Sequence, residues 1–163
     1  MSTASAPRAG DALPPLEIPV TRTLIVAGAI ASRDYQDVHH DVELAKAKGS
    51  PDIFMNILTT NGLVGRYLTD CFGPGATLRK VAIRLGVPNY PGDTMTLTGT
   101  VEQVEQVEQG AVGAEGAAEG GTATVTVNVV GANSIGKHVT GTVTLTVPAG
   151  PVRTAGARAG GDA

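Results

Sequence analysis

Three segments in the second half of the chain alternate polar residues, mostly threonine, with apolar ones. They are TMTLTGTV at 94–101, TATVTVNVV at 122–130 and VTGTVTLTV at 139–147. Because successive side chains of a strand point to opposite faces, this period of two predicts antiparallel strands with one buried face. The residues expected on the buried face are Met95, Leu97, Val101, Val125, Val127, Val129, Val139, Val143, Leu145 and Val147. Another strand is expected in TLRKVAIRLGV (77–87), which gives a four-strand meander. Because one face of this sheet is apolar, a second layer must cover it.

Residues 50–75, SPDIFMNILTTNGLVGRYLTDCFGPG, provide that layer as one long helix. Ser50 is a suitable N-cap, Pro51 suits the first helical position, and Gly73 followed by Pro74 marks the end. The helical stripe consists of Ile53, Phe54, Ile57, Leu58, Val64, Tyr67, Leu68, Cys71 and Phe72. The predicted fold class is α+β, with one central helix wrapped by an antiparallel sheet.

The remaining segments set the expected domain limits. TRTLIVAGAIAS (21–32) is a short apolar run that predicts a buried strand. Residues 1–15 and 149–163 are small, polar and rich in proline or glycine, which predicts disordered tails around a domain at 16–148. Residues 102–121 combine a repeated Val-Glu-Gln triplet with glycine, alanine and glutamate, and this composition predicts an expanded, acidic hairpin loop.

Composition excludes several classes of function. A length of 163 residues suits one domain, and a formal charge of −3 gives no basic footprint for nucleic acid or an anionic membrane. The single cysteine, Cys71, cannot form an intramolecular disulfide or a cysteine-based zinc site. The sequence shows no signal-peptide pattern and no run near the roughly 20 apolar residues of a membrane span. We therefore expect a soluble, cytoplasmic protein.

The segment SRDYQDVHHDVELAKAKGSPDIF, residues 32–54, places two of the three histidines among five carboxylates. A metal site would use His39, His40 and Asp41, but adjacent side chains diverge on a regular element, and we expect no metal here. An acid/base pair of Asp34 and His39 is the second interpretation, since a turn can bring residues five apart onto one water molecule. By spacing alone, a solvated turn before a helix is the better explanation of the cluster.

Beyond spacing, DYQDVHHDVELA resembles the hydratase motif of MaoC-like and R-specific enoyl-CoA hydratases, with matches at Asp34, His39, Asp41 and Ala45. The segment FGPGATLRKVAIRLGVPNYPGDTMTLTGTV is also similar to that family. The resemblance implies a hot-dog fold and addition of water to a 2-enoyl-CoA, with Asp34 and His39 activating the water and no metal or redox cofactor.

Two positions depart from the family pattern. Gln36-Asp37 replace the usual Asn-Pro, and Met55-Asn56 replace a His-Gly pair at the start of the central helix. The resemblance implies that the backbone N–H at Asn56 contributes to an oxyanion hole. It also implies that the helix begins near residue 55, later than Ser50 indicates.

Four segments, RDYQDVHHD, GSPDIFMNILT, LVGRYLTD and RLGVPNY, are similar to small single-domain subunits of bacterial steroid side-chain enoyl-CoA hydratases. That resemblance implies a bulky steroid enoyl-CoA substrate and a heteromer with a larger MaoC-like subunit. A non-catalytic hot-dog partner subunit and an acyl-CoA thioesterase remain as alternatives. We further expect His40 to be exposed, His138 to lie on the surface of its strand, and Cys71 to be a buried, inert thiol.

Overall fold

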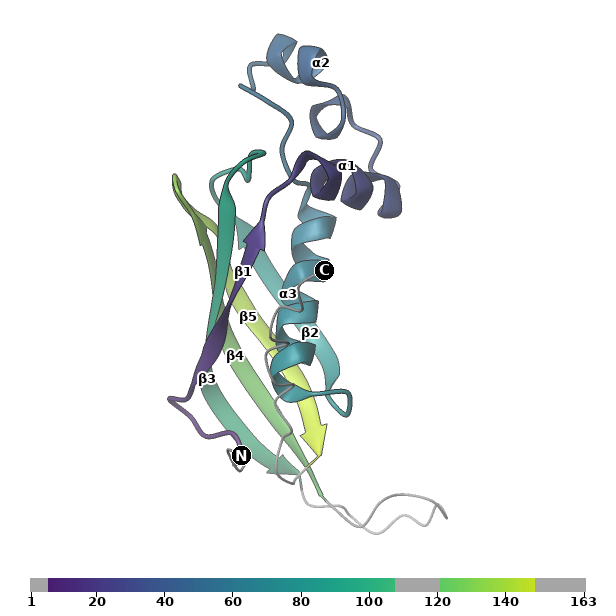
Figure 1. Ribbon diagram of the computed structural model, residues 1–163. Helices are drawn as coiled ribbons and strands as arrows, with labels where there is room; N and C mark the ends of the chain where they lie inside the picture. Colours follow the sequence, from purple (N-terminus) through teal and green to yellow (C-terminus); the bar gives the residue numbers. More distant parts are fainter. Residues whose placement is uncertain (1–5, 108–120, 149–163) are drawn as a thin grey trace, which may run out of the picture.

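The computed structural model describes residues 6–107 and 121–148, which form one curved sheet around a long helix (Figure 1). The helices are α1 (Arg22–Ala31), η1 (Asp37–His39), α2 (Val42–Ala47) and α3 (Ile57–Phe72), where η1 is a single 3₁₀ turn. The strands are β1 (Ala12–Pro19), β2 (Thr77–Leu85), β3 (Thr94–Val107), β4 (Thr122–Asn133) and β5 (Gly136–Pro148). The predicted α+β class, with one central helix against an antiparallel sheet, is confirmed.

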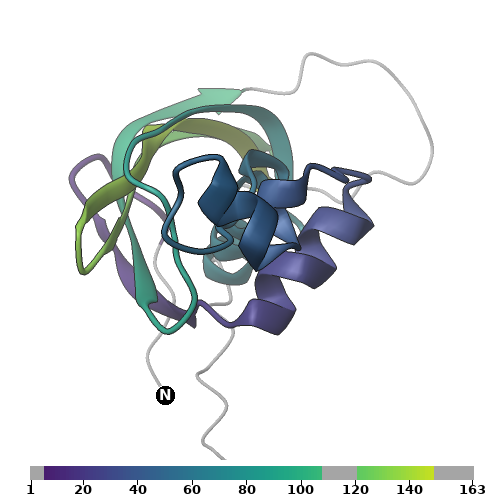
Figure 2. The same cartoon turned by 90° about the horizontal axis from the view of Figure 1, so that it is seen from above.

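The five strands are ordered β1-β3-β4-β5-β2, and every neighbouring pair is antiparallel. The chain makes a meander from β3 to β5, but β2 lies at the far edge beside β5 and β1 forms the other edge. Seen from above, the sheet curves around α3, while α1 and α2 lie beyond the N-terminal end of that helix (Figure 2). The expected four-strand meander is therefore corrected to a five-stranded sheet with a crossover.

The core lies between the concave face of the sheet and α3. All ten residues predicted for the buried face of β3, β4 and β5 are at most 1% exposed, which confirms the period-of-two interpretation. From α3, Val64, Tyr67 and Leu68 pack into the same core. Gly99 of β3 permits this approach, because a Cβ there would lie 3.2 Å from the Tyr67 ring and hydroxyl.

Residues 22–31 form a helix, so the predicted strand at 21–32 is wrong. Thr21 caps α1 by accepting a hydrogen bond from the Leu24 N–H, and only Ile25 and Ala29 are buried, four residues apart on one helical face. A short apolar run carries no usable periodicity, and here the N-cap and the alanine content decide the conformation.

The central helix begins at Ile57, with Asn56 as its N-cap, and not at Ser50. Residues 50–55 instead form an irregular segment whose polar groups are satisfied by distant partners. The Met55 N–H donates to the Asn89 carbonyl, and the Phe54 N–H donates to the Val38 carbonyl. These tertiary hydrogen bonds replace the intrahelical bonds that the Ser-Pro signal predicted.

Two expected boundaries also change. Strand β1 begins at Ala12, inside the segment assigned to the N-terminal tail, and β3 continues to Val107, inside the predicted loop at 102–121. The remainder of that loop and the C-terminal tail at 149–163 fall outside the described residues. No helix in the ranges 6–107 and 121–148 has both the length and the apolar character needed to cross a lipid bilayer.

Candidate active site

Asp34 owes its position to the way α1 ends. The Asp34 N–H donates to the Ala29 carbonyl and the Arg33 N–H donates to the Ile30 carbonyl. Arg33 adopts a left-handed conformation with φ of 56°. This pair of bonds is a Schellman motif, which reverses the chain directly after a helix. The reversal brings Asp34 back toward the N-terminus of α3.

His39 belongs to the 3₁₀ turn η1, and its ring is fixed by the segment that precedes α3. Its Nδ1 lies 2.7 Å from the Phe54 carbonyl oxygen, and the two aromatic rings meet edge to face at 5.0 Å. Because a carbonyl oxygen only accepts, Nδ1 carries the proton of the neutral ring. The lone pair of neutral His39 is therefore on Nε2.

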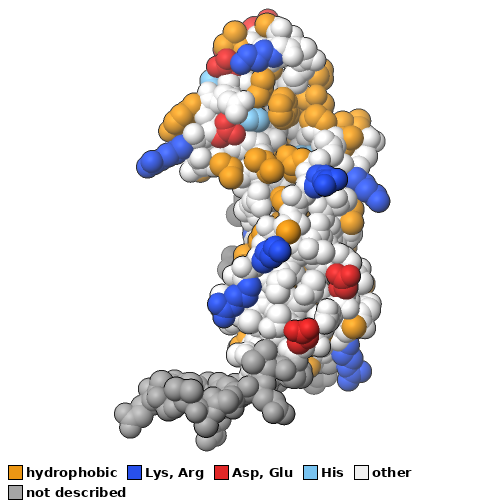
Figure 3. Space-filling model, turned by 180° about the vertical axis from the view of Figure 1, so that it is seen from behind, with side chains coloured by type: hydrophobic (Ala, Val, Ile, Leu, Met, Phe, Trp, Pro, Cys, Tyr) orange, Lys and Arg blue, Asp and Glu red, His pale blue; other side chains and the backbone are white. Residues whose placement is uncertain are grey.

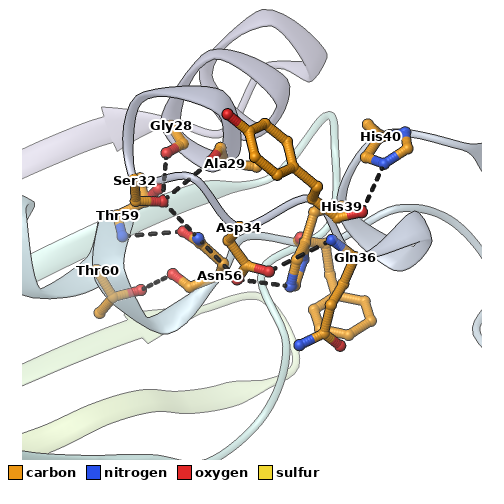
Figure 4. A network of polar contacts seen from close by, with 12 residues as sticks. Gly28, Ala29, Ser32, Asp34, Gln36, His39, His40, Asn56, Thr59 and Thr60 are labelled. Carbon is orange, nitrogen blue, oxygen red and sulfur yellow. Dashed lines mark hydrogen bonds and ion pairs between the residues drawn. The ribbon is translucent and has the colours of Figure 1, made fainter.

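The free nitrogen of His39 faces Asp34 (Figure 4). Nε2 lies 3.4 Å from Asp34 Oδ2, and the two side chains are only 7% and 17% exposed. The prediction that the Asp34 and His39 side chains lie close together is confirmed. The pair presents a lone pair and a carboxylate side by side, so both groups can accept hydrogen bonds from one water molecule.

Asn56 completes this arrangement at the start of α3. Its side-chain Nδ2 donates to Asp34 Oδ2 at 3.0 Å and to Ser32 Oγ at 2.8 Å. Its Oδ1 accepts from the Thr59 N–H at 2.9 Å and so caps the helix. Across the described ranges, the backbone N–H of Asn56 donates no hydrogen bond. The positive end of α3 and an available N–H therefore lie beside the Asp34–His39 pair.

Helices α1 and α3 approach each other closely where they hold these groups. A Cβ on Gly28 would come within 2.2 Å of the Thr59 Oγ1, so no larger residue fits at this crossing without displacing the Thr59 side chain. The same turn of α1 carries Ser32, whose hydroxyl donates to the Gly28 carbonyl at 2.7 Å. The spacing between Ser32 and Asn56 therefore follows from the helix packing.

The loop before α3 is held by an ion pair with α1. Arg22 donates two hydrogen bonds to the Asp52 carboxylate, at 3.0 and 2.6 Å, and this holds the pKa of Asp52 below its usual value. Asp52 also accepts from the Ile53 N–H, at 2.8 Å. These contacts connect the start of α1 to the segment that orients His39.

The other residues of the histidine cluster lie outside the Asp34–His39 pair. His40 is exposed, as expected, and its Nε2 lies 3.1 Å from the Tyr35 carbonyl oxygen. Asp41 caps α2 by accepting from the Leu44 N–H, and Ala45 is fully buried beneath that helix. In the part of the chain that the structure describes, no three His, Cys, Asp or Glu side chains form a candidate metal site.

Two residues outside the cluster differ from expectation. His138 is not on the surface but 1% exposed, with Nδ1 2.7 Å from the Val87 carbonyl oxygen and Nε2 2.9 Å from Thr60 Oγ1. The strand alternation is interrupted here, since both His138 and Val139 are buried where β5 passes under α3. Cys71 is only partly buried, and this burial raises the pKa of its thiol to about 11.

Sequence reasoning missed the Ser32 hydroxyl and the Asn56 side chain. The family resemblance pointed only to the backbone at Asn56, because it implied glycine there. Asn immediately before a helical run is nevertheless an N-cap signal, and that signal was available in the sequence.

Large apolar side chains are exposed around the site. Ile57 and Leu58, predicted to be in the buried stripe, are 45% and 50% exposed at the first turn of α3. Ile30, Tyr35 and Leu44, from α1, the following loop and α2, are similarly exposed. Figure 3 shows hydrophobic side chains gathered over this end of the molecule, beside acidic and histidine side chains. Exposed apolar groups at this density mark a surface for a ligand or another chain.

Comparison with known proteins agrees with this architecture. Residues 5–122 match the model of the MaoC like domain. The chain is 46% identical over 138 residues to the 3-oxo-4,17-pregnadiene-20-carboxyl-CoA hydratase beta subunit of Mycobacterium tuberculosis, a match that covers 85% of this chain and 95% of that protein.

Solved structures agree with this match. A chain in the crystal structure of the ChsH1-ChsH2 complex from Mycobacterium tuberculosis matches with a TM-score of 0.73 and 46% identity, over 86% of this chain and 98% of that chain. The (R)-hydratase from A. caviae involved in PHA biosynthesis, at 18% identity, shares the fold with a TM-score of 0.69, over 89% of this chain and 100% of that one. The expected hot-dog fold is confirmed, and the chain belongs to the MaoC-like domain family.

Proposed function

We propose that this chain is the catalytic subunit of an enoyl-CoA hydratase that acts on a steroid side-chain thioester. The observation that carries the proposal is the buried pair of Asp34 and His39, with the His39 Nε2 lone pair 3.4 Å from the carboxylate. This pair lies beside the N-terminus of a helix, which favours developing negative charge.

In the proposed reaction, Asp34 and His39 hold one water molecule between them. His39 Nε2 takes a proton from the water as the water oxygen forms a bond to C3 of the enoyl group. The electrons of the C2=C3 double bond move toward the thioester oxygen, and the imidazolium of His39 then gives its proton to C2. Asp34 orients the water and stabilises the imidazolium that forms. These proton transfers require no metal or redox cofactor.

The charge on the thioester oxygen needs a donor, and the backbone N–H of Asn56 is the proposed one. Its position at the N-cap of α3 adds the helix dipole to the hydrogen bond. Loss of one such donor typically costs about 3–4 kcal/mol of transition-state stabilisation.

The name of the 46% identical relative supports a steroid carboxyl-CoA substrate, and the matched crystal structure is of a two-component complex. We therefore propose that this chain works as a heteromer with a larger MaoC-like subunit. The exposed apolar side chains around the site are consistent with a surface that the partner or the steroid covers.

The test is to co-express the chain with that larger subunit and supply 3-oxo-4,17-pregnadiene-20-carboxyl-CoA. Hydration removes the ultraviolet absorbance of the conjugated enoyl thioester without releasing a free thiol. Release of CoA would instead indicate a thioesterase. Hydration that survives loss of both Asp34 and His39 would assign this chain to a non-catalytic role.

A further inference from the structure

The Asn56 side chain lies between the end of α1 and the start of α3, with a partner for each polar atom (Figure 4). Asn56 is 2% exposed. A buried amide with its donors and acceptor engaged resists rotation, because any rotation leaves buried polar atoms unpaired.

The chemistry of the partners determines which way the amide points. The Thr59 N–H can only donate, so the amide oxygen must face it. The Asp34 carboxylate accepts, so the amide nitrogen must face that side. The Ser32 hydroxyl donates its proton to the Gly28 carbonyl, so the Ser32 oxygen can accept a hydrogen bond from the Asn56 amide nitrogen. The reversed amide would place oxygen against oxygen and N–H against N–H.

We propose that the Asn56 side chain is a positioning residue for the hydration reaction, which holds Asp34 Oδ2 toward His39. This inference rests on the proposed function and extends it. The backbone N–H of Asn56 donates to the thioester oxygen, while its side chain holds the Asp34 carboxylate that orients the water. One residue at the helix N-cap thereby fixes the distance between the two parts of the reaction centre.

The alternative role for this side chain is purely structural, as a helix cap that fills space. The positioning role and the structural role predict opposite rankings of kcat for two variants. Asn56→Asp keeps the size and the cap but turns a donor toward Asp34 into a repelling oxygen. Asn56→Ser keeps a hydroxyl that can cap the helix but removes the amide N–H that reaches Asp34.

The experiment measures kcat and KM for both variants in the co-expressed complex, with steroid enoyl-CoA as substrate. If Asn56 positions Asp34, Asn56→Asp lowers kcat by about 10²-fold or more and Asn56→Ser by about 10-fold, with KM little changed. Asn61→Asp, one turn further along α3, is the control for added charge, because the Asn61 side chain donates only to the Ile57 carbonyl. Its kcat should remain that of the parent complex.

A space-filling role predicts the reverse order, with Asp tolerated better than Ser, and that result would overturn the inference. If Asn56→Asp fails to assemble, Asn56→Ser decides, since an unchanged kcat in that variant also contradicts the proposal. Failure of the proposed function is distinct, because the parent complex itself would then not hydrate the substrate.

Discussion

Thr60 of α3 and His138 of β5 are joined by a hydrogen bond of 2.9 Å between the hydroxyl oxygen and Nε2. The other ring nitrogen, Nδ1, donates to the Val87 carbonyl at 2.7 Å. Neutral His138 therefore accepts from Thr60, and a polar link joins the central helix to the sheet inside an apolar core. Burial lowers the pKa of His138 below its ordinary value.

This shift predicts an acid sensitivity. Below about pH 6.5, the ordinary pKa of histidine, the unfolded chain binds a proton that the folded chain does not, so acidification favours unfolding. The contribution is at most about 1.4 kcal/mol per pH unit for one proton, and it ends below the folded-state pKa. His138→Asn should reduce the dependence of unfolding free energy on pH between about 5 and 7, as measured by urea denaturation.

The exposed His40 provides the matched control for this measurement. His40→Gln controls for the replacement of a histidine, because this side chain is exposed and lies outside the core. Equal pH dependence in the parent and the His138→Asn variant would contradict the assignment of this histidine.

The proposed catalytic pair predicts large losses of activity. Asp34→Asn and His39→Ala should each lower kcat for hydration by about 10²-fold or more, as expected for a positioned acid/base group. His40→Ala, which changes the adjacent histidine, should leave activity close to that of the parent. Steady-state kinetics of the co-expressed complex measure all three, and near-parental activity in both Asp34→Asn and His39→Ala would remove this pair from the mechanism.

A second Schellman motif ends α2, where the Gly49 N–H donates to the Lys46 carbonyl and the Ser50 N–H donates to the Ala45 carbonyl. The two motifs predict opposite effects on stability. Arg33 ends α1 with φ of 56°, and Gly49 ends α2 with φ of 88°. A left-handed backbone is strained for arginine but not for glycine. Arg33→Gly should therefore change the unfolding free energy by about +1 kcal/mol, and Gly49→Ala should lower it by a similar amount.

Urea unfolding at neutral pH measures both changes. A Cβ on Gly49 would meet no atom within 4 Å, so the cost of Gly49→Ala is conformational and not steric. A destabilised Arg33→Gly variant would show that the arginine side chain contributes more than its backbone strain costs.

Cys71 should react slowly with alkylating reagents. With the pKa of its thiol raised from 9.0 to about 11, the reactive thiolate is roughly 100-fold less populated near neutral pH. Iodoacetamide labelling followed by mass spectrometry should give a native rate about 100-fold below that in urea. Equal rates in the two conditions would show that this thiol is freely accessible.

The sequence by itself determined which residues of three strands face the core. The alternation in 94–101, 122–130 and 139–147 identified ten core residues of β3, β4 and β5, because the period of a strand is a local property of the chain. The resemblance of DYQDVHHDVELA to the hydratase motif also identified Asp34 and His39 as a candidate pair, which the structure places 3.4 Å apart. A pattern that depends only on neighbours in the chain can be interpreted without a structure.

Only the tertiary structure decided how the site is built. Residues 50–55 stayed outside α3 and His138 was buried, because each outcome depends on contacts with distant segments. The Asn56 amide meets Asp34 and Ser32 across 22 and 24 residues of sequence. Hydrogen bonds of this range form only after α1 and α3 have packed together, and no local pattern of residues encodes their partners.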